Sequence, residues 1–148
     1  MSSTEGDLKD VVAIGNAMVD VVVPGTEEAL LQGNLLKGGM VLIDRERALK
    51  MYKSVNVAIE MSGGSVGNTM AGIASLGGTG SYVGKVSDDD LGATFSDSLG
   101  SLGISFVGPS KSATAPTARC FVMVTPDGQR SMATYLGACV ELGPDDID

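Results

Sequence analysis

The sequence predicts an α/β protein that contains part of a doubly wound parallel sheet with a small β unit beside it. Two patterns support this prediction. Between residues 56 and 107, short β-branched runs alternate with segments of helical periodicity, which is typical of parallel strands covered by helices. Between residues 119 and 136, two apolar runs flank Pro126-Asp127-Gly128-Gln129, which predicts an antiparallel hairpin. The 148 residues suffice for one domain with a hydrophobic core.

The first half of the chain begins with a polar segment, residues 1–9, which we expect to be flexible. A β-branched run follows and is interrupted by Gly15-Asn16. Thr26 and Asp44 are suitable N-caps for two helices. In order, the expected elements are strands at 11–23, 40–43 and 57–61, and helices at 27–31, 45–53 and 66–76.

The second half continues the alternation and then changes to the hairpin. Asp88 is expected to cap a helix that ends near residue 102, between strands at 81–86 and 104–107. The hairpin strands are expected at 119–125 and 130–136. Pro144 fits the first position of a further helix. Because the sequence stops within that turn, we expect the chain to be part of a longer protein.

Composition excludes two classes of partner. The net charge is −8 and the ten Lys and Arg residues are scattered, so the basic patch that a nucleic-acid-binding protein needs is absent. No apolar stretch is long enough to span a bilayer, and the N-terminus does not resemble a secretory signal. Cys120 and Cys139 lack the spacing of a metal site and are expected to be buried thiols. We therefore expect a cytoplasmic protein that binds neither nucleic acid nor membrane.

A glycine pair at an expected strand-to-helix junction is the first candidate site. Gly63-Gly64 precedes the helix, where backbone N–H groups are unpaired and a ligand can approach the main chain. Asn68 falls in the first helical turn, so its amide can reach the same place. The alternative is a tight turn with a solvated Asn, because a short glycine loop alone is a weak signal.

Three other glycine motifs fit this sequence less well. Residues 63–67 match G-x-S-x-G, but the chain contains no His to serve as the base of a hydrolase triad. A Walker A loop is absent, because Thr79 and Val86 replace required residues around Gly84-Lys85. No dinucleotide-binding G-x-G-x-x-G follows the first strand.

Asp20 is the second candidate, because a carboxylate within an apolar strand needs a partner. It either faces solvent from an edge strand or accepts hydrogen bonds from vicinal hydroxyl groups of a ligand.

Taken together, these motifs resemble the PfkB, or ribokinase-like, family of carbohydrate kinases over nearly the whole chain from Val11. The order and spacing of the pieces carry the resemblance, which is nearest to bacterial adenosine-kinase-like members. The matching pieces are Gly15-Asn16 with Asp20, Gly63-Gly64-Ser65 with Asn68-Thr69, Leu76-Gly77-Gly78, Val83–Val86 with Asp88-Asp89, Leu102-Gly103-Ile104, and Val124–Gly128 with Arg130-Ser131.

The resemblance implies a ribokinase-like α/β domain over residues 10–148, with a β lid formed by strands near 18–23, 39–43, 118–125 and 130–136. It implies that Asp20, Gly63, Gly64 and Asn68, with Asn16 nearby, hold the hydroxyl groups of a sugar or nucleoside. Other side chains have weaker assignments: Met40, Phe121 and Leu136 are candidates for apolar contacts, although packing within the lid is the simpler interpretation. Asp88-Asp89-Asp90 is interpreted as a helix cap rather than a metal site.

The resemblance also implies transfer of a phosphoryl group from ATP with Mg²⁺ to a primary hydroxyl. In the family the catalytic Asp, in a Gly-Ala-Gly-Asp motif, and the nucleotide site lie further along the chain than residue 148, so we expect no catalytic residue and no activity in this chain alone. Tyr135 stands where many adenosine kinases have Asn, which leaves the acceptor open. The alternative is a binding or dimerisation module, with two copies joined through the lid strands.

Overall fold

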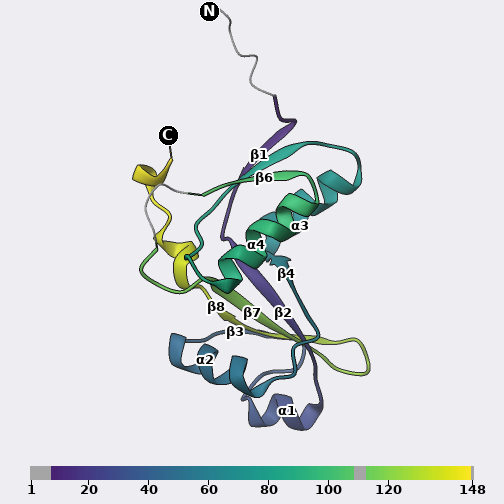
Figure 1. Ribbon diagram of the computed structural model, residues 1–148. Coiled ribbons are helices and arrows are strands. Elements are labelled where there is room, and N and C mark those ends of the chain that lie inside the picture. Colours follow the sequence, from purple (N-terminus) through teal and green to yellow (C-terminus); the bar gives the residue numbers. More distant parts are fainter. Residues whose placement is uncertain (1–7, 109–112, 148) are drawn as a thin grey trace, which may run out of the picture.

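The computed structural model describes residues 8–108 and 113–147, and these form two sheets with helices between and beside them (Figure 1). One is a three-stranded parallel sheet of order β1-β5-β6, and the other is a five-stranded mixed sheet of order β3-β8-β7-β2-β4. The elements are β1 (Val11–Ile14), β2 (Met18–Pro24), α1 (Glu27–Gln32), β3 (Met40–Leu42), α2 (Arg45–Ser54), β4 (Ile59–Gly63), α3 (Gly64–Ser75), β5 (Gly80–Val83), α4 (Asp90–Ser101), β6 (Ile104–Val107), β7 (Ala118–Val124) and β8 (Arg130–Tyr135).

The parallel sheet packs one of its faces against α3 and α4. Tyr82 from β5 and Ile104 from β6 are buried with Met70 of α3 and with Phe95 and Leu99 of α4. The Tyr82 and Phe95 rings meet edge to face with centroids 5.4 Å apart. Helix α4 also packs against β2 and β4, so the helical layer connects the two sheets.

One expectation about the parallel sheet is wrong. The strand expected at 57–61 does not begin this sheet, because β4 pairs antiparallel with β2 in the other sheet. Its place beside β5 is taken by β1, which pairs in parallel from Val11 to Ile14. Strand periodicity identifies a strand but not its partner, and partner choice depends on distant segments.

The five-stranded sheet contains the four segments expected as lid strands, joined by β4. Strand β2 lies inside it, parallel to β7 and antiparallel to β4, and the β7–β8 hairpin is antiparallel as expected. Val19, Val21 and Val23 of β2 are buried on one face together with Leu30 of α1 and Ala48 of α2. The opposite face carries the alternate residues of the same strands, including Asp20.

One more expectation needs correction. Asp89, not Asp88, caps α4: one carboxylate oxygen accepts from the Gly92 N–H at 2.9 Å and the other accepts from the Thr117 N–H at 2.9 Å. For Phe121 the simpler interpretation, packing within the lid, is confirmed: it is fully buried on the helix-covered face, and its ring lies 6.4 Å from the Tyr52 ring.

The segment after β8 forms two short 3₁₀ turns, Gly137–Glu141 and Pro144–Asp146, with Pro144 at the first position of the second. The Lys85 ammonium and the Asp146 carboxylate lie 3.0 Å apart, and both side chains are almost completely buried. This ion pair fixes the last turn to the end of β5. Both cysteines are buried free thiols, as expected. Residues 1–7 of the segment expected to be flexible lie outside the described residues. Within the described ranges, every helix is too short or too polar to cross a membrane.

Candidate functional site

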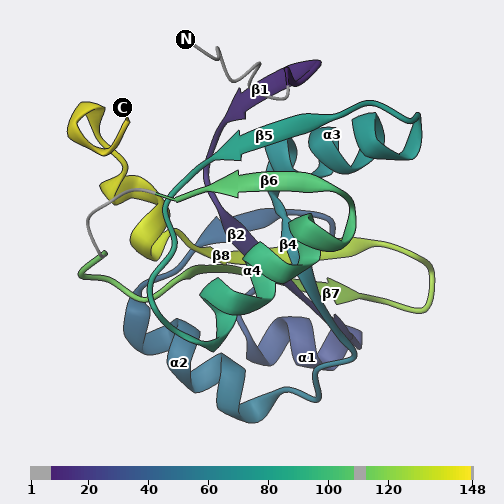
Figure 2. The same ribbon diagram turned by 45° about the horizontal axis from the view of Figure 1, so that its top comes forward.

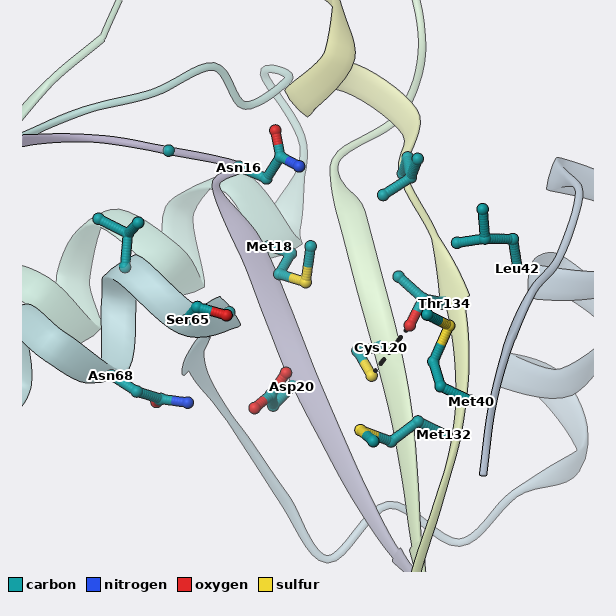
Figure 3. A pocket seen from close by; sticks show the side chains of 14 residues that line it. Asn16, Met18, Asp20, Met40, Leu42, Ser65, Asn68, Cys120, Met132 and Thr134 are labelled. Carbon is teal, nitrogen blue, oxygen red and sulfur yellow. Dashed lines mark hydrogen bonds between the residues drawn. The ribbon is translucent and has the colours of Figure 1, made fainter. Parts of the chain in front are cut away.

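A cavity of about 620 Å³ lies over the face of the five-stranded sheet that the helices leave open. Its floor comes from β2, β7 and β8, and its sides come from the first turn of α3, the bend between β1 and β2, and β3. Figure 3 shows mostly polar side chains, with Met18, on the side of β2 and α3, and mostly sulfur-containing and aliphatic side chains, with Thr134, on the side of β3 and β8. The cavity is therefore amphipathic.

Asp20 provides the carboxylate of the cavity floor. Its neighbours across the strands are Met61 of β4 and Cys120 of β7, so the sheet offers it no cationic partner. The carboxylate has no hydrogen bond or ion pair with any of the described residues. Burial raises the pKa of this carboxyl above its ordinary value. A half-buried carboxylate without a donor is costly for the fold, and a ligand with hydroxyl groups would supply the missing donors.

The glycine pair allows the strands and α3 to approach Asp20. A Cβ atom at Gly63 would overlap the Asp20 carboxyl group, so only glycine leaves room for it. Gly64 has φ +78°, in the left-handed region, and a Cβ there would lie 3.2 Å from the Asn16 carbonyl oxygen. Gly64 lines the cavity, whereas Gly63 lies beneath the Asp20 carboxyl group and does not.

Two amide side chains complete the polar side. Asn16 lies in the bend after β1, and Asn68 lies in α3, which begins at Gly64 without a side-chain cap. Both line the cavity, and neither side chain has a hydrogen-bond partner within residues 8–108 and 113–147. In Figure 3 the Asn68 amide and the Asp20 carboxylate extend from different elements into the same space. Four of the five residues predicted from the sequence therefore line one cavity, and the fifth, Gly63, lies directly beneath Asp20.

The sequence predicts only part of the apolar side of the cavity. Met40 and Leu136, for which packing within the lid was the simpler interpretation, line the cavity together with Leu42 and Met132. Cys120 lies in the floor, where its Sγ accepts a hydrogen bond from the Thr134 hydroxyl at 3.3 Å and burial raises the pKa of its thiol. The hairpin register places Cys120, Met132 and Thr134 on one face, but only the pairing of β7 with β2 shows that this is the face of Asp20.

Tyr135 is not part of the cavity. It packs against the hydrophobic core on the helix-covered side of the sheet, opposite Arg119 of β7. No group of three or more Cys, Asp or Glu side chains that could hold a metal ion occurs in the described part of the chain.

Known proteins share this architecture. The model of the pfkB family carbohydrate kinases matches residues 8–147. The adenosine kinase from Sinorhizobium meliloti is 48% identical with a TM-score of 0.84, over 95% of this chain and 43% of that chain. A probable sugar kinase from Rhizobium etli is 45% identical with a TM-score of 0.84, over 95% of this chain and 42% of that one. The fructokinase of Solanum tuberosum is 28% identical over 127 residues, which are 81% of this chain and 39% of the fructokinase.

This chain therefore spans less than half the length of these relatives. The match nevertheless includes nearly all of its residues, and both sheets and the cavity lie within the matched range. The chain belongs to the pfkB family of carbohydrate kinases.

Proposed function

We propose that this chain is the acceptor-binding part of an ATP-dependent kinase that phosphorylates a primary hydroxyl group of a nucleoside or sugar. The observation that carries the proposal is the convergence of Asn16, Asp20 and Asn68, three polar side chains without protein partners among the described residues, on one cavity. Vicinal hydroxyl groups match this set, because a carboxylate only accepts hydrogen bonds whereas each amide can both donate and accept.

A nucleoside such as adenosine is the acceptor that the cavity favours. Met40, Leu42, Met132 and Leu136 would contact the flat face of the aromatic base, whereas the ribose would lie near Asp20 and Asn68. A free hexose has hydroxyl groups on all sides and would leave some of them against these side chains without partners. The 48% identity to an adenosine kinase supports the same choice, and the fructokinase relatives make fructose the second candidate.

The described residues would act by binding and orientation. The Asp20 carboxylate, the Asn68 amide and the first-turn N–H groups of α3 would fix the sugar ring, and the five-stranded sheet would act as a lid that excludes water. ATP would supply the phosphoryl group, and Mg²⁺ would neutralise negative charge on the phosphate groups of ATP. Residues 8–108 and 113–147 contain no group of three or more Cys, Asp or Glu side chains that could hold the metal ion.

Isothermal titration calorimetry of the chain with adenosine, ribose and fructose tests the proposal. We expect saturable binding of adenosine, weaker binding of the two free sugars, and no release of ADP when ATP is added. Absence of binding for all three compounds would contradict the assignment of the site. Tighter binding of fructose than adenosine would instead reverse the choice of acceptor.

The alternative is a dimerisation module formed by the lid strands. Ile59 and Met61 on β4 and Met40 and Leu42 on β3 are exposed large apolar side chains on the open face of the sheet. Light scattering over a range of protein concentrations separates the two functions. A dimer that forms without ligand binding would favour the module.

A further inference from the structure

A second cavity, of about 610 Å³, lies between α1 and α2 on the helix-covered face of the five-stranded sheet. In Figure 2, as in Figure 1, these two helices lie side by side at the end of the molecule away from the parallel sheet. Met123 of β7 lines this cavity, whereas Cys120 of the same strand lines the candidate site. Because side chains alternate along a strand, the two cavities lie on opposite faces of one sheet and are separate.

Two cationic side chains of α2 line this second cavity, and no Asp or Glu of residues 8–108 and 113–147 does. Arg47 and Lys50 are three positions apart on the helix, so they lie on the same side of it. Neither forms an ion pair with an acidic side chain in the described part of the chain. The chain has 18 acidic and only ten basic residues, so two unpaired cations at one cavity favour a negatively charged occupant.

The Arg47 guanidinium is already held at the edge of the cavity. One of its terminal nitrogens donates a hydrogen bond to the carbonyl oxygen of Gly33, which ends α1. Its other N–H groups have no acceptor among the residues that the structure describes. A planar guanidinium with several free N–H groups matches the oxygen atoms of a phosphate group, and a side chain that is already fixed loses less entropy on binding.

The rest of the lining indicates an organic ligand rather than an inorganic ion. Apolar and amide side chains make up most of it, namely Ala29, Met51, Val55 and Met123 with Gln32 and Asn34. The volume is in the range of sites for small organic molecules, which are typically apolar with a few polar groups. An inorganic ion would leave the apolar side chains without a contact.

We propose that the cavity between α1 and α2 is a binding site for a nucleoside monophosphate, separate from the acceptor site. The phosphate group would bind Arg47 and Lys50, and the base would lie against the apolar side chains with its polar edge at the two amides. A sugar phosphate carries the same charged group but no base, so it would use only part of the cavity. The proposal does not depend on the proposed function, because it uses no residue of the acceptor site.

Methyl NMR of the chain during titration with AMP tests the proposal, because methionines report on the two cavities separately. Met51 and Met123 line the cavity between the helices, whereas Met40 and Met132 line the candidate site. We expect AMP to shift the Met51 and Met123 signals saturably, and ribose 5-phosphate, inorganic phosphate and adenosine to act on them only at higher concentrations. Binding of AMP should weaken as the salt concentration rises, because the two cations are partly exposed.

Substitutions on α2 distinguish a specific site from general attraction of anions. Arg47→Gln should raise the Kd for AMP on the order of 10- to 100-fold, because it removes charge-assisted hydrogen bonds. Lys50→Gln should raise the Kd about 3- to 10-fold. Lys50 is exposed and has no hydrogen bond within residues 8–108 and 113–147, so this variant should fold like the parent chain. Lys53→Gln is the matched control, because Lys53 is exposed on the same helix but does not line the cavity, and the Kd should change about twofold or less.

Three results would overturn the proposal. They are Met51 and Met123 signals that do not move with AMP, Arg47→Gln and Lys50→Gln variants that bind AMP as tightly as the parent chain, and a Lys53→Gln variant that weakens binding as much as Lys50→Gln does. Equal affinities for AMP and inorganic phosphate would overturn the assigned class of ligand. Adenosine binding at the candidate site is measured by other signals, so failure of one site leaves the assignment of the other intact.

Discussion

Replacement of Asp20 by Asn is the most informative perturbation of the site. The change keeps the shape of the side chain but removes the charge and one of two acceptor oxygens. Hydrogen bonds to a charged group contribute about 1.5–3 kcal/mol each. Loss of about 2–3 kcal/mol from the binding of a vicinal diol corresponds to a roughly 30- to 150-fold increase in Kd. We therefore expect Asp20→Asn to bind adenosine at least this much more weakly than the parent chain.

The same variant should gain stability, with a defined pH dependence. Burial raises the pKa of the Asp20 carboxyl, so the folded state holds its proton at a higher pH than the unfolded state does. The free energy of unfolding contributed by this group therefore falls as pH rises through the folded pKa. At pH 7 Asp20→Asn should be more stable than the parent, and the difference should vanish below the unfolded pKa of about 3.9. Because the side chain is only half-buried, solvent screening keeps this gain small.

Calorimetry with adenosine and urea denaturation at pH 7 and at low pH measure both effects. Asp97→Asn is the matched control, because Asp97 is exposed on α4 and should change neither quantity. Weaker binding combined with unchanged or greater stability identifies a carboxylate retained for its ligand. Unchanged adenosine affinity would refute the role of Asp20, and weaker binding accompanied by lost stability would indicate a structural role instead.

Other substitutions test the surroundings of the site by affinity and by chemical denaturation. Gly63→Ala should displace the Asp20 carboxylate and weaken adenosine binding. The matched control is Gly72→Ala, in an open helical position, which should leave the affinity unchanged and raise stability by about 0.5–1 kcal/mol. Equal adenosine affinities of the two variants would contradict the role of Gly63. Lys85→Met breaks a buried ion pair and should cost about 3–5 kcal/mol of stability. Lys37→Met breaks only exposed ion pairs and should change stability little, so similar losses in the two variants would argue against burial as the cause. The buried Tyr82 hydroxyl has no hydrogen-bond partner among residues 8–108 and 113–147, so Tyr82→Phe should raise stability by about 1 kcal/mol. A loss of stability would show instead that this hydroxyl donates or accepts a hydrogen bond.

The polar half of the site could be predicted from the sequence because local rules determine it. A carboxylate within an apolar strand and a glycine pair before a helix are unusual choices, and each points to a ligand without knowledge of the fold. Asp20, Gly64, Asn68 and Asn16 meet at the cavity for this reason, and Gly63 lies directly beneath them.

The apolar half depends on register, which the sequence does not reveal. Residues 118–123 of β7 are all buried, so no alternation of polar and apolar residues distinguishes the face of Cys120 from the face of Phe121. Only pairing with β2 places Cys120 beside Asp20 and Phe121 on the helical side. The same limit explains Asp88 and Asp89: either could cap α4, and the bond from the distant Thr117 N–H to Asp89 fixes the choice.

The bend between β1 and β2 connects the stability of the parallel sheet to the geometry of the site. A Cβ atom at Gly15 would lie 2.7 Å from Val66 Cγ2 and 3.2 Å from the Tyr82 hydroxyl, so α3 and the core of the parallel sheet both press on this backbone. Asn16 follows Gly15 directly and lines the cavity, and Asp20 follows within β2 on the same side of the sheet. Since interiors are close-packed and transmit small shifts, a side chain added at Gly15 should move Asn16 and Asp20 relative to Asn68. Gly15→Ala should therefore weaken adenosine binding in calorimetry although Gly15 carries no polar side chain, and an unchanged affinity would contradict this connection between the parallel sheet and the site.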